Sequence, residues 1–267
     1  MLLVHGLGEH SGRHQNTVNF MTDHGFEVVR FDLRGAGHSG GRRQWIEHFS
    51  DYVEDTAKVS NWISSTLEPL PLFVLGHSLG GAISIHFTAI YGKTMRGLIL
   101  SAPALIVGEG ISPLKIAVGK LLSRVAPHLK IANSTEKNAI SRDPQVVEAY
   151  QNDPLSCHFN TVRQGNEILK ALNAIPDLIK KITLPVLIVH GSMDRIIKLE
   201  GSYQILREIA SKDRTFHILS GGYHEPHNDL DKEYYFTLML QWLEKQLSAT
   251  SRNRVAKPAR AQANLGA

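Results

Sequence analysis

The sequence contains one strong candidate for a nucleophile, a serine with a glycine two residues before it and another two residues after it. The run Gly76-His77-Ser78-Leu79-Gly80 fits the pattern G-x-S-x-G, in which the serine lies on a sharp turn from a strand into a helix. Glycines at these positions let neighbouring backbones approach the turn, which lifts the hydroxyl out of the sheet. An apolar stretch at 72–75 precedes the run and an Ala/Ile-rich stretch at 81–90 follows it. This context, rather than the pentapeptide alone, predicts that Ser78 is a catalytic nucleophile.

A serine hydroxyl needs a general base and a group that orients the base. In folds with such a turn, the acid and then the histidine follow the serine along the chain. Asp194 comes after a predicted strand at 186–189, and His224 comes after a predicted strand at 216–219. We therefore predict Asp194 as the acid and His224 as the base, with His227 as the competing histidine. No pair of histidines has the spacing of a metal site, so no metal is predicted.

An acyl-transfer intermediate also needs two amide donors for its oxyanion. One is the N–H of Leu79, which directly follows the candidate nucleophile. The other is the N–H of Leu7, in the loop after a predicted strand at 2–4. A simple glycine turn, built on Gly6 and Gly8, is the alternative for this loop.

These residues can meet only if a sheet brings their loops to one edge. Short apolar runs typical of strands buried on both faces occur at 2–4, 26–31, 72–75, 98–100, 186–189 and 216–219. Helical patterns lie between them, at about 14–24, 51–67, 79–92, 201–211 and 232–247. This alternation predicts an α/β protein with a mostly parallel, doubly wound sheet. Ligand sites of such sheets lie beyond the carboxyl ends of the strands, where the candidate residues are placed.

The stretch 105–180 interrupts this alternation, and it predicts several helices and no strand. We expect it to form a helical cap over a core made of 1–104 and 181–247. Within it, an apolar stripe runs at helical spacing from Leu114 to Val125. The sequence favours packing of this stripe on the cap's own core; a lid helix that makes transient contact with a membrane surface is the alternative.

Composition narrows the class of protein. The chain has 267 residues, 42% hydrophobic residues and a formal charge of +4, much of it in the segment 248–267, which we predict to be a disordered basic tail. Residues 1–247 are then near neutral in charge, which argues against a nucleic-acid partner. The start of the chain lacks the features of a signal peptide, and no run is long enough for a membrane span, so we expect a cytoplasmic protein, with peripheral membrane association as a further option.

The sequence gives no reason to expect a disulfide or a cofactor. Cys157 is the only cysteine, and it lies in a polar stretch that does not favour a catalytic thiol. The phosphate-binding pattern G-x-x-x-x-G-K-[ST] is absent, and the G-x-G-x-x-G run at 35–40 does not open a predicted helix. Phosphoryl and hydride transfer are therefore disfavoured.

Several motifs together resemble one family, the monoacylglycerol lipases and related lysophospholipases of the α/β-hydrolase fold. The similar segments are His5-Gly6-Leu7-Gly8-Glu9-His10-Ser11-Gly12-Arg13-His14, Asp32-Leu33-Arg34-Gly35-Ala36-Gly37-His38-Ser39-Gly40, the run around Ser78, Gly191-Ser192-Met193-Asp194-Arg195, and Tyr223-His224 with His227 nearby. The resemblance is in register from residue 1 to about 247. It implies the same catalytic residues, Ser78, Asp194 and His224, with Leu7 and Leu79 as oxyanion donors.

The resemblance also implies which residues hold the substrate. Members of this family bind the glycerol head with a Glu and an Arg of the first loop and a second His, which match Glu9, Arg13 and His227 here. A local surface ion pair is the alternative for Glu9 and Arg13. The family usually has an N-terminal β-hairpin before the first strand; no segment of this sequence matches it, so we expect a sheet without that hairpin.

The sequence therefore predicts a serine hydrolase that cleaves a lipid-like ester, with a monoacylglycerol as the leading substrate. Lysophospholipids, short-chain carboxylic esters and aminoacyl substrates are alternatives on the same fold. A binding protein without activity is a further alternative, although all three catalytic candidates are present. The sequence does not fix the oligomeric state.

Overall fold

The computed structural model describes residues 1–107, 113–132 and 138–255, without the side chains of 113, 115 and 249–255. Its centre is a sheet of six strands in the order β2-β1-β3-β4-β7-β8, and every neighbouring pair is parallel. The strands are β1 (Leu2–Val4), β2 (Val29–Arg30), β3 (Phe73–His77), β4 (Gly97–Ser101), β7 (Val186–Gly191) and β8 (Arg214–Leu219). This confirms the predicted α/β fold with a parallel, doubly wound sheet.

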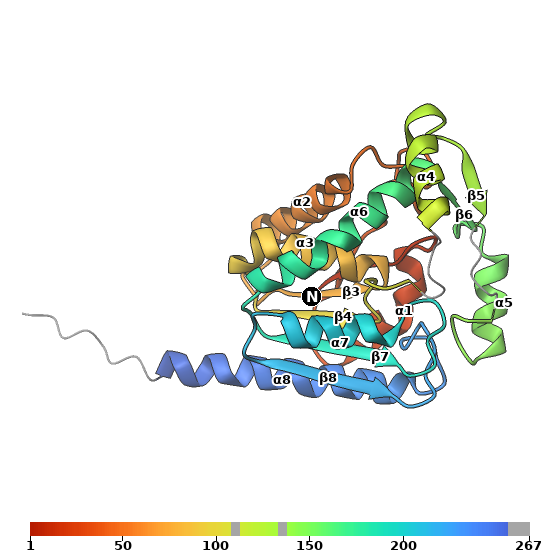
Figure 1. Ribbon diagram of the computed structural model, residues 1–267. Coiled ribbons are helices and arrows are strands. Elements are labelled where there is room, and N and C mark those ends of the chain that lie inside the picture. Colours follow the sequence, from red (N-terminus) through yellow and green to blue (C-terminus); the bar gives the residue numbers. More distant parts are fainter. Residues whose placement is uncertain (108–112, 133–137, 256–267) are drawn as a thin grey trace, which may run out of the picture.

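Helices cover both faces of this sheet (Figure 1). They are α1 (Gln15–Asp23), α2 (Ser50–Thr66), α3 (Leu79–Tyr91), α6 (Val162–Leu178), α7 (Leu199–Glu208) and α8 (Lys232–Val255), with short 3-10 turns η1 (Ser11–His14), η2 (Gly92–Thr94) and η3 (Ile179–Lys181). One face packs on α2, α3 and α6, around fully buried residues such as Ile83 and Ile175. The other face packs on α1 and α8, around Met21 and Met239. The central strands are buried on both sides, which is why they appear in the sequence as continuous apolar runs.

The edges of the sheet differ from the prediction in detail. The strand predicted at 26–31 is reduced to the two residues of β2, which lies at an edge and is only half buried. In the described part of the chain β2 forms this edge of the sheet, next to β1.

The segment between β4 and β7 carries the cap, and one prediction about it is wrong. It contains helices α4 (Pro113–Val125) and α5 (Pro144–Asn152), but also two strands, β5 (Lys130–Ala132) and β6 (Phe159–Thr161), which pair antiparallel. Each strand has three residues, too few for an alternating pattern to stand out in the sequence. Their pairing is supported across the ladder, where Lys130 Nζ lies 4.3 Å from the centre of the Phe159 ring.

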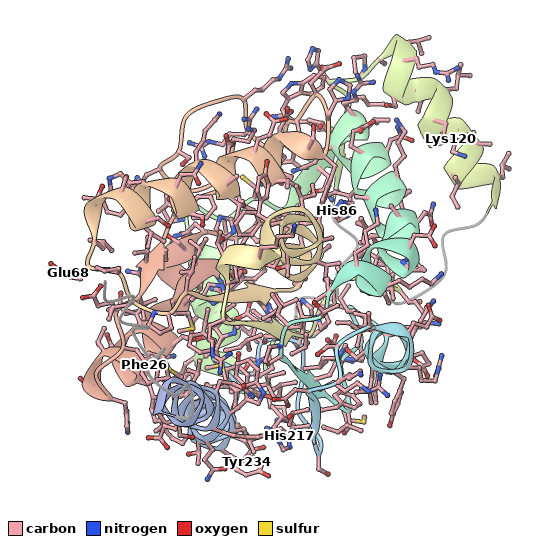
Figure 2. The ribbon with its side chains drawn as sticks, turned by 90° about the vertical axis from the view of Figure 1, so that its left-hand side faces the viewer. Phe26, Glu68, His86, Lys120, His217 and Tyr234 are labelled. Atoms are coloured by element: carbon pink, nitrogen blue, oxygen red, sulfur yellow. The ribbon has the colours of Figure 1, made fainter. Side chains whose placement is uncertain are left out.

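Local capping fixes where the cap helices begin. The side chain of Asp143 accepts a hydrogen bond from Gln145 N, with Pro144 in the first turn of α5. Thr161 caps α6 in the same way, through Gln164 N. Helix α6 then runs back onto α3, where His86 Nε2 donates to Ala171 O at 3.1 Å, so His86 packs between these two helices (Figure 2).

The apolar stripe on α4 does not pack on a core of the cap, contrary to our expectation. Four of its side chains are exposed: Leu114 by 73%, Val118 by 47%, Leu121 by 60% and Val125 by 70%. The helix contacts α6 through its opposite side and stands at the periphery of the molecule, with Lys120 pointing outward (Figure 2). No helix in the described part of the chain is both long enough and apolar enough to cross a bilayer.

Part of the segment predicted as a disordered tail is helical. Helix α8 continues to Val255, through residues assigned to the disordered segment 248–267. No glycine or proline occurs between Leu247 and Pro258, so the sequence contains no helix breaker there. The rest of the predicted tail, 256–267, lies outside the described residues.

Candidate active site

Ser78 lies where β3 turns into α3, at the centre of the sheet's carboxyl edge. Its backbone has φ 53° and ψ −118°, a conformation that costs about 1–3 kcal/mol in a residue other than glycine. Four backbone hydrogen bonds hold it there: Ser78 N donates to Ser101 O at 3.0 Å, and Ser78 O accepts from Gly81 N, Ala82 N and Ala104 N. The turn presents the Ser78 side chain away from the sheet.

The two glycines of the motif are required by close backbone contacts. A Cβ atom at Gly76 would lie 2.4 Å from Gly80 O, and one at Gly80 would lie 2.1 Å from Val4 O. Neither contact can be relieved by moving a side chain. The motif therefore keeps α3 tight against the ends of β1 and β3.

His224 connects the two other predicted catalytic residues. Its Nε2 lies 3.0 Å from Ser78 Oγ, and its Nδ1 lies 2.7 Å from Asp194 Oδ2. Because an ionised carboxylate can only accept, Nδ1 carries the proton and Nε2 is free to accept from the serine hydroxyl. Burial lowers the pKa of His224, but the Asp194 charge and hydrogen bond outweigh it, so the pKa is raised above its usual value. The structure thus brings together the three residues that the sequence predicted.

Asp194 is held by four hydrogen bonds. Oδ1 accepts from Ile196 N at 2.8 Å and Ile197 N at 3.0 Å, and Oδ2 accepts from His190 Nε2 at 3.1 Å as well as from His224. Burial opposes ionisation, yet the nearby His224 and these bonds keep the pKa of Asp194 well below its usual value. Asp194 is therefore a carboxylate in a fixed orientation.

His190 is a further partner of Asp194, and we did not predict this role from the sequence. Its Nδ1 lies 2.7 Å from Ser202 Oγ in α7, which fixes the ring. The signal that could have identified it is its place at the end of β7, four residues before Asp194. His5, at the end of β1, bonds two loop backbones: Nδ1 donates to Gly6 O and Nε2 accepts from Leu33 N.

The candidate oxyanion donors belong to the residue after Ser78 and to the loop after β1. Leu79 N is the first amide of α3, and Leu7 follows Gly6, whose Cβ position would lie only 3.2 Å from Ser78 Cβ. Within the described residues, neither amide donates a hydrogen bond to another atom. The Leu7 loop is tethered to the cap, because Cys157 N donates to Gly8 O at 2.8 Å. Both N–H groups are thus available beside the serine, a geometry suited to an oxyanion.

Glu9 is buried beside this loop, so the alternative of a surface ion pair with Arg13 is wrong. Its Oε1 accepts from Gly6 N and lies 3.1 Å from His14 Nε2. Burial raises the pKa of Glu9, but the opposing influence of His14 and of other nearby histidines holds it well below its usual value. His14 in turn stacks on His227, with ring centres 4.1 Å apart. Neither His14 nor this stacking was apparent from the sequence.

Arg13 is also buried, but most of its guanidinium is already used. Its Nη2 donates to both oxygens of Glu225, at 2.8 and 2.6 Å, and the guanidinium lies over the Tyr150 ring, 4.7 Å from its centre. Arg13 Nε is 3.5 Å from Glu9 Oε2, an ion-pair distance without a hydrogen bond. Sequence reasoning missed Glu225, which directly follows His224 and links the Arg13 loop to the His224 loop.

Three buried polar atoms close to the serine have no hydrogen-bond partner among the described residues: Glu9 Oε2, Arg13 Nε and His227 Nε2. They belong to the three residues predicted to hold a substrate head. Buried polar groups of folded proteins are nearly always satisfied, so these atoms point to a polar ligand. Glu9, His14 and His227 also offer donor atoms that lie within 4.8 Å of one another and could hold a metal ion.

The fold and this geometry define a serine hydrolase of the α/β-hydrolase class. Residues 1–231 match the family described as Serine aminopeptidase, S33 (Hydrolase_4), and the chain belongs to that family. A monoacylglycerol lipase of Mycolicibacterium smegmatis is 34% identical over 92% of this chain and 88% of its own length. A monoglyceride lipase of Rattus norvegicus is 33% identical over 86% of this chain and 76% of its own length. The crystal structure of Paleococcus ferrophilus monoacylglycerol lipase superposes with a TM-score of 0.85 at 29% identity, covering 92% of this chain and 93% of that one.

Proposed function

We propose that this protein hydrolyses monoacylglycerols to a fatty acid and glycerol through an acyl-enzyme on Ser78. The observation that carries the proposal is the cluster of three unsatisfied buried polar atoms, on Glu9, Arg13 and His227, beside the Ser78–His224 pair. Relatives that cover most of the chain are named as lipases of this substrate. A hydrolytic serine lies next to the buried polar side chains of Glu9, Arg13 and His227, which we call the head-group recess. This combination matches an ester with a hydroxylated head.

Acylation begins with the Ser78 hydroxyl. His224 Nε2, 3.0 Å from Oγ, takes the proton as Oγ attacks the ester carbonyl. When the carbon–oxygen bond to glycerol breaks, His224 returns this proton to the glycerol oxygen. Water then attacks the acyl-enzyme, with His224 again taking a proton, and the fatty acid leaves with Ser78 restored.

Charge that develops in these steps is met by groups already in place. The N–H groups of Leu7 and Leu79 donate to the oxyanion, and the Asp194 carboxylate stabilises the imidazolium of His224. Asp194 stays ionised throughout because its pKa is held well below the usual value by His224 and His190, which outweigh its burial.

The head-group recess accounts for preference among esters. Glu9 Oε2 accepts from one hydroxyl of the glycerol, while His227 Nε2 and Arg13 Nε bond the other. Arg13 contributes mainly by position, because its Nη2 is held by Glu225. A monoacylglycerol has two free hydroxyls for these atoms. An ester of a simple alcohol leaves His227 Nε2 without a partner, and leaves Glu9 Oε2 and Arg13 Nε with only their 3.5 Å ion pair, which costs binding free energy.

We also propose that α4 is the surface that meets lipid. Leu114, Val118, Leu121 and Val125 form one exposed apolar face, and the exposed Lys120 and Arg124 can reach anionic head groups. The helix belongs to the cap, which lies beyond the carboxyl ends of the strands (Figure 1). Contact there would bring a membrane-borne substrate near the site.

A substrate panel tests the proposed activity. The purified chain is given a monoacylglycerol, the methyl ester of the same fatty acid, a lysophospholipid and an aminoacyl amide. We expect the highest kcat/KM for the monoacylglycerol, and a higher value for the lysophospholipid or the amide would overturn the assignment. Glu9→Gln should lower kcat/KM for the monoacylglycerol by about 10- to 100-fold, because a hydrogen bond to a charged group contributes about 1.5–3 kcal/mol, and it should lower the methyl ester value much less.

The matched control is Glu68→Gln, at an exposed position far from the site (Figure 2). It should leave both rates unchanged. An equal loss for both esters in Glu9→Gln would contradict a head-group role for Glu9.

A further inference from the structure

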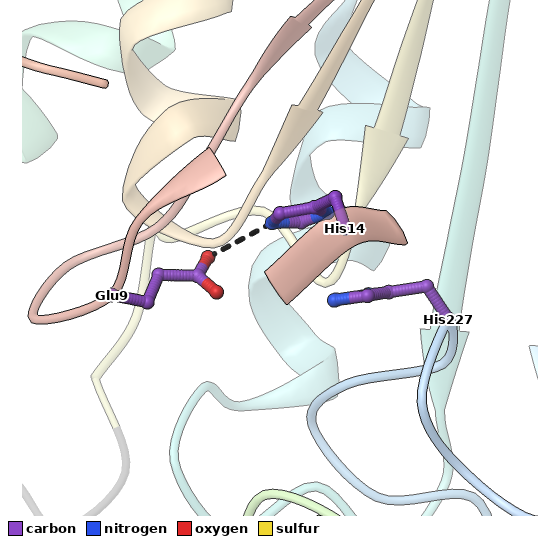
Figure 3. A group of neighbouring side chains, drawn as sticks. All are labelled: Glu9, His14 and His227. Atoms are coloured by element: carbon purple, nitrogen blue, oxygen red, sulfur yellow. Dashed lines mark hydrogen bonds and ion pairs between the residues drawn. The ribbon is translucent and has the colours of Figure 1, made fainter. Parts of the chain in front are cut away.

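The Glu9, His14 and His227 side chains form a compact set of potential metal ligands that the catalytic steps do not use. Their donor atoms all lie within 4.8 Å of one another (Figure 3). They come from three segments: the loop after β1, the end of η1 and the loop after β8. In Figure 3 the rings of His14 and His227 both direct a nitrogen toward the carboxylate of Glu9.

Two of these donor atoms make no hydrogen bond within the described part of the chain. Glu9 Oε2 and His227 Nε2 have no hydrogen-bond partner among the described residues, and the two side chains belong to residues only 4% and 1% exposed. The side chains around these two atoms therefore do not satisfy them by hydrogen bonds. A ligand that accepts electron pairs from both atoms would satisfy them together.

Two charged side chains meet at the cluster. The Glu9 carboxylate can ligate a cation, and the Arg13 guanidinium, whose Nε lies 3.5 Å from Glu9 Oε2, offsets part of its negative charge.

The donor set is two imidazoles and one carboxylate, which is typical of zinc sites that keep a fourth position open. Tetrahedral coordination at about 2.0–2.1 Å would place the ligand atoms about 3.3 Å apart, so the stacked, near-parallel rings of His14 and His227 must turn substantially for their nitrogens to converge on one ion. Ligation through His14 Nε2 displaces the proton that this nitrogen now donates to Glu9.

We propose that Glu9, His14 and His227 form a site for a divalent transition-metal ion, best matched by Zn²⁺, and that its occupation inhibits the enzyme by blocking the head-group recess. The ion takes up the same Glu9 and His227 atoms that bind the glycerol hydroxyls. The inhibitory part of this inference rests on the proposed function, but metal binding itself does not.

Metal binding is measured first, without any substrate. The full chain is stripped with a chelator and titrated with Zn²⁺ against a chromophoric chelator, and with Co²⁺ by visible absorption. We expect one tight Zn²⁺ site, and a Zn²⁺ affinity at least about 100-fold lower in His14→Gln. Loss of a residue that only hydrogen-bonds a metal ligand lowers metal affinity by about 10- to 100-fold, and loss of a ligand itself should lower it more. Glu9→Gln should lose the site as well.

The control for surface histidines is His48→Gln, since His48 is exposed and remote in sequence from the cluster. It should retain the tight site. Circular dichroism confirms that each variant is folded, and the two ligand variants remove different elements of the site. Absence of a tight site, or a tight site that survives His14→Gln and Glu9→Gln, would overturn the proposal.

Inhibition is measured second, with two esters. Zn²⁺ should raise KM for a monoacylglycerol, and it should inhibit p-nitrophenyl acetate, which lacks a glycerol head, much less. Equal inhibition of the hydrolysis of both esters would show that Zn²⁺ does not act by blocking the head-group recess. If the protein fails to hydrolyse monoacylglycerol, the proposed function fails while the Zn²⁺ titration still decides the metal site.

Discussion

The substitution Asp194→Asn changes the catalytic acid with the least change in shape. Asp194 accepts four hydrogen bonds, from Ile196 N and Ile197 N at Oδ1 and from His190 and His224 at Oδ2. An asparagine can accept on only one side. If its oxygen stays with the two backbone amides, its NH₂ group faces His224, and Nδ1 of that ring must then accept. The proton moves to Nε2, which faces Ser78, and the ring can no longer take the serine proton.

The other orientation of the amide is no better. It would direct NH₂ at the N–H groups of Ile196 and Ile197 and lose two hydrogen bonds at once. We therefore expect kcat to fall by about 10⁴, the size of effect that a wrong tautomer has in other serine hydrolases, or about 5.4 kcal/mol. KM should change little, because Asp194 does not contact the substrate.

The assay is steady-state hydrolysis of a monoacylglycerol by the variant, with thermal unfolding as a check on the fold. Asp177→Asn is the matched control, because Asp177 is 86% exposed and pairs only with Lys180 among the described residues. It should retain full activity. A loss below about tenfold in a folded Asp194→Asn protein would refute the assignment of Asp194 as the residue that sets the His224 tautomer.

Three further perturbations address the base, the elbow and the cap. Because the base must be neutral and the pKa of His224 is raised by Asp194 despite burial, kcat/KM should rise with pH through a pKa above 6.5, and a midpoint below 6.5 would contradict this. Gly80→Ala places a Cβ 2.1 Å from Val4 O. The turn that carries Ser78 should shift by on the order of 1 Å, and kcat should fall by about 100-fold. The control Gly165→Ala, where the added Cβ meets no atom within 4 Å, should stay active. Leu121→Glu should weaken binding to anionic vesicles by about tenfold or more in a sedimentation assay. Leu70→Glu, at a similarly exposed position on another surface, should not weaken it. Equal effects of the two substitutions would rule out α4 as the lipid-binding surface.

Local patterns were sufficient to predict the sheet and its carboxyl edge. The strands around Leu75 and Val189 are buried on both faces, so burial itself produces the continuous apolar runs visible in the sequence. The elbow at Ser78 is equally local, since the glycines that it needs lie within five residues. From these elements the sequence predicted that Asp194 and His224 approach Ser78, and the structure places them within hydrogen-bond distance.

Features that depend on contacts between distant segments were missed. Glu225 binds Arg13 across more than 200 residues, and this pair has no sequence signature. The bond from His190 to Asp194 is local but was also missed, although His190 lies at the end of β7, only four residues before Asp194. The β5–β6 ladder is too short to give a periodic pattern. The exposure of the α4 stripe was predicted wrongly because helical periodicity shows that a face is apolar, not what covers it.

The roles of Leu7, Leu79, Glu9, Arg13 and His227 remain predictions, supported by position. The same holds for the division into core, cap and tail. Helix α6 packs on α3 in the core and on α4 in the cap, so a boundary at 180 has to be tested by dissection of the chain.

The central claim is that Ser78 is the nucleophile of an enzyme that acts on monoacylglycerols. The most direct measurement is covalent labelling of the folded chain with a fluorophosphonate, followed by mass spectrometry of its peptides, with and without a monoacylglycerol as competitor. The account predicts one labelled residue, Ser78, no labelling in Ser78→Ala, and slower labelling when the monoacylglycerol is present. No labelling of the folded protein, or labelling that persists in Ser78→Ala, would contradict it.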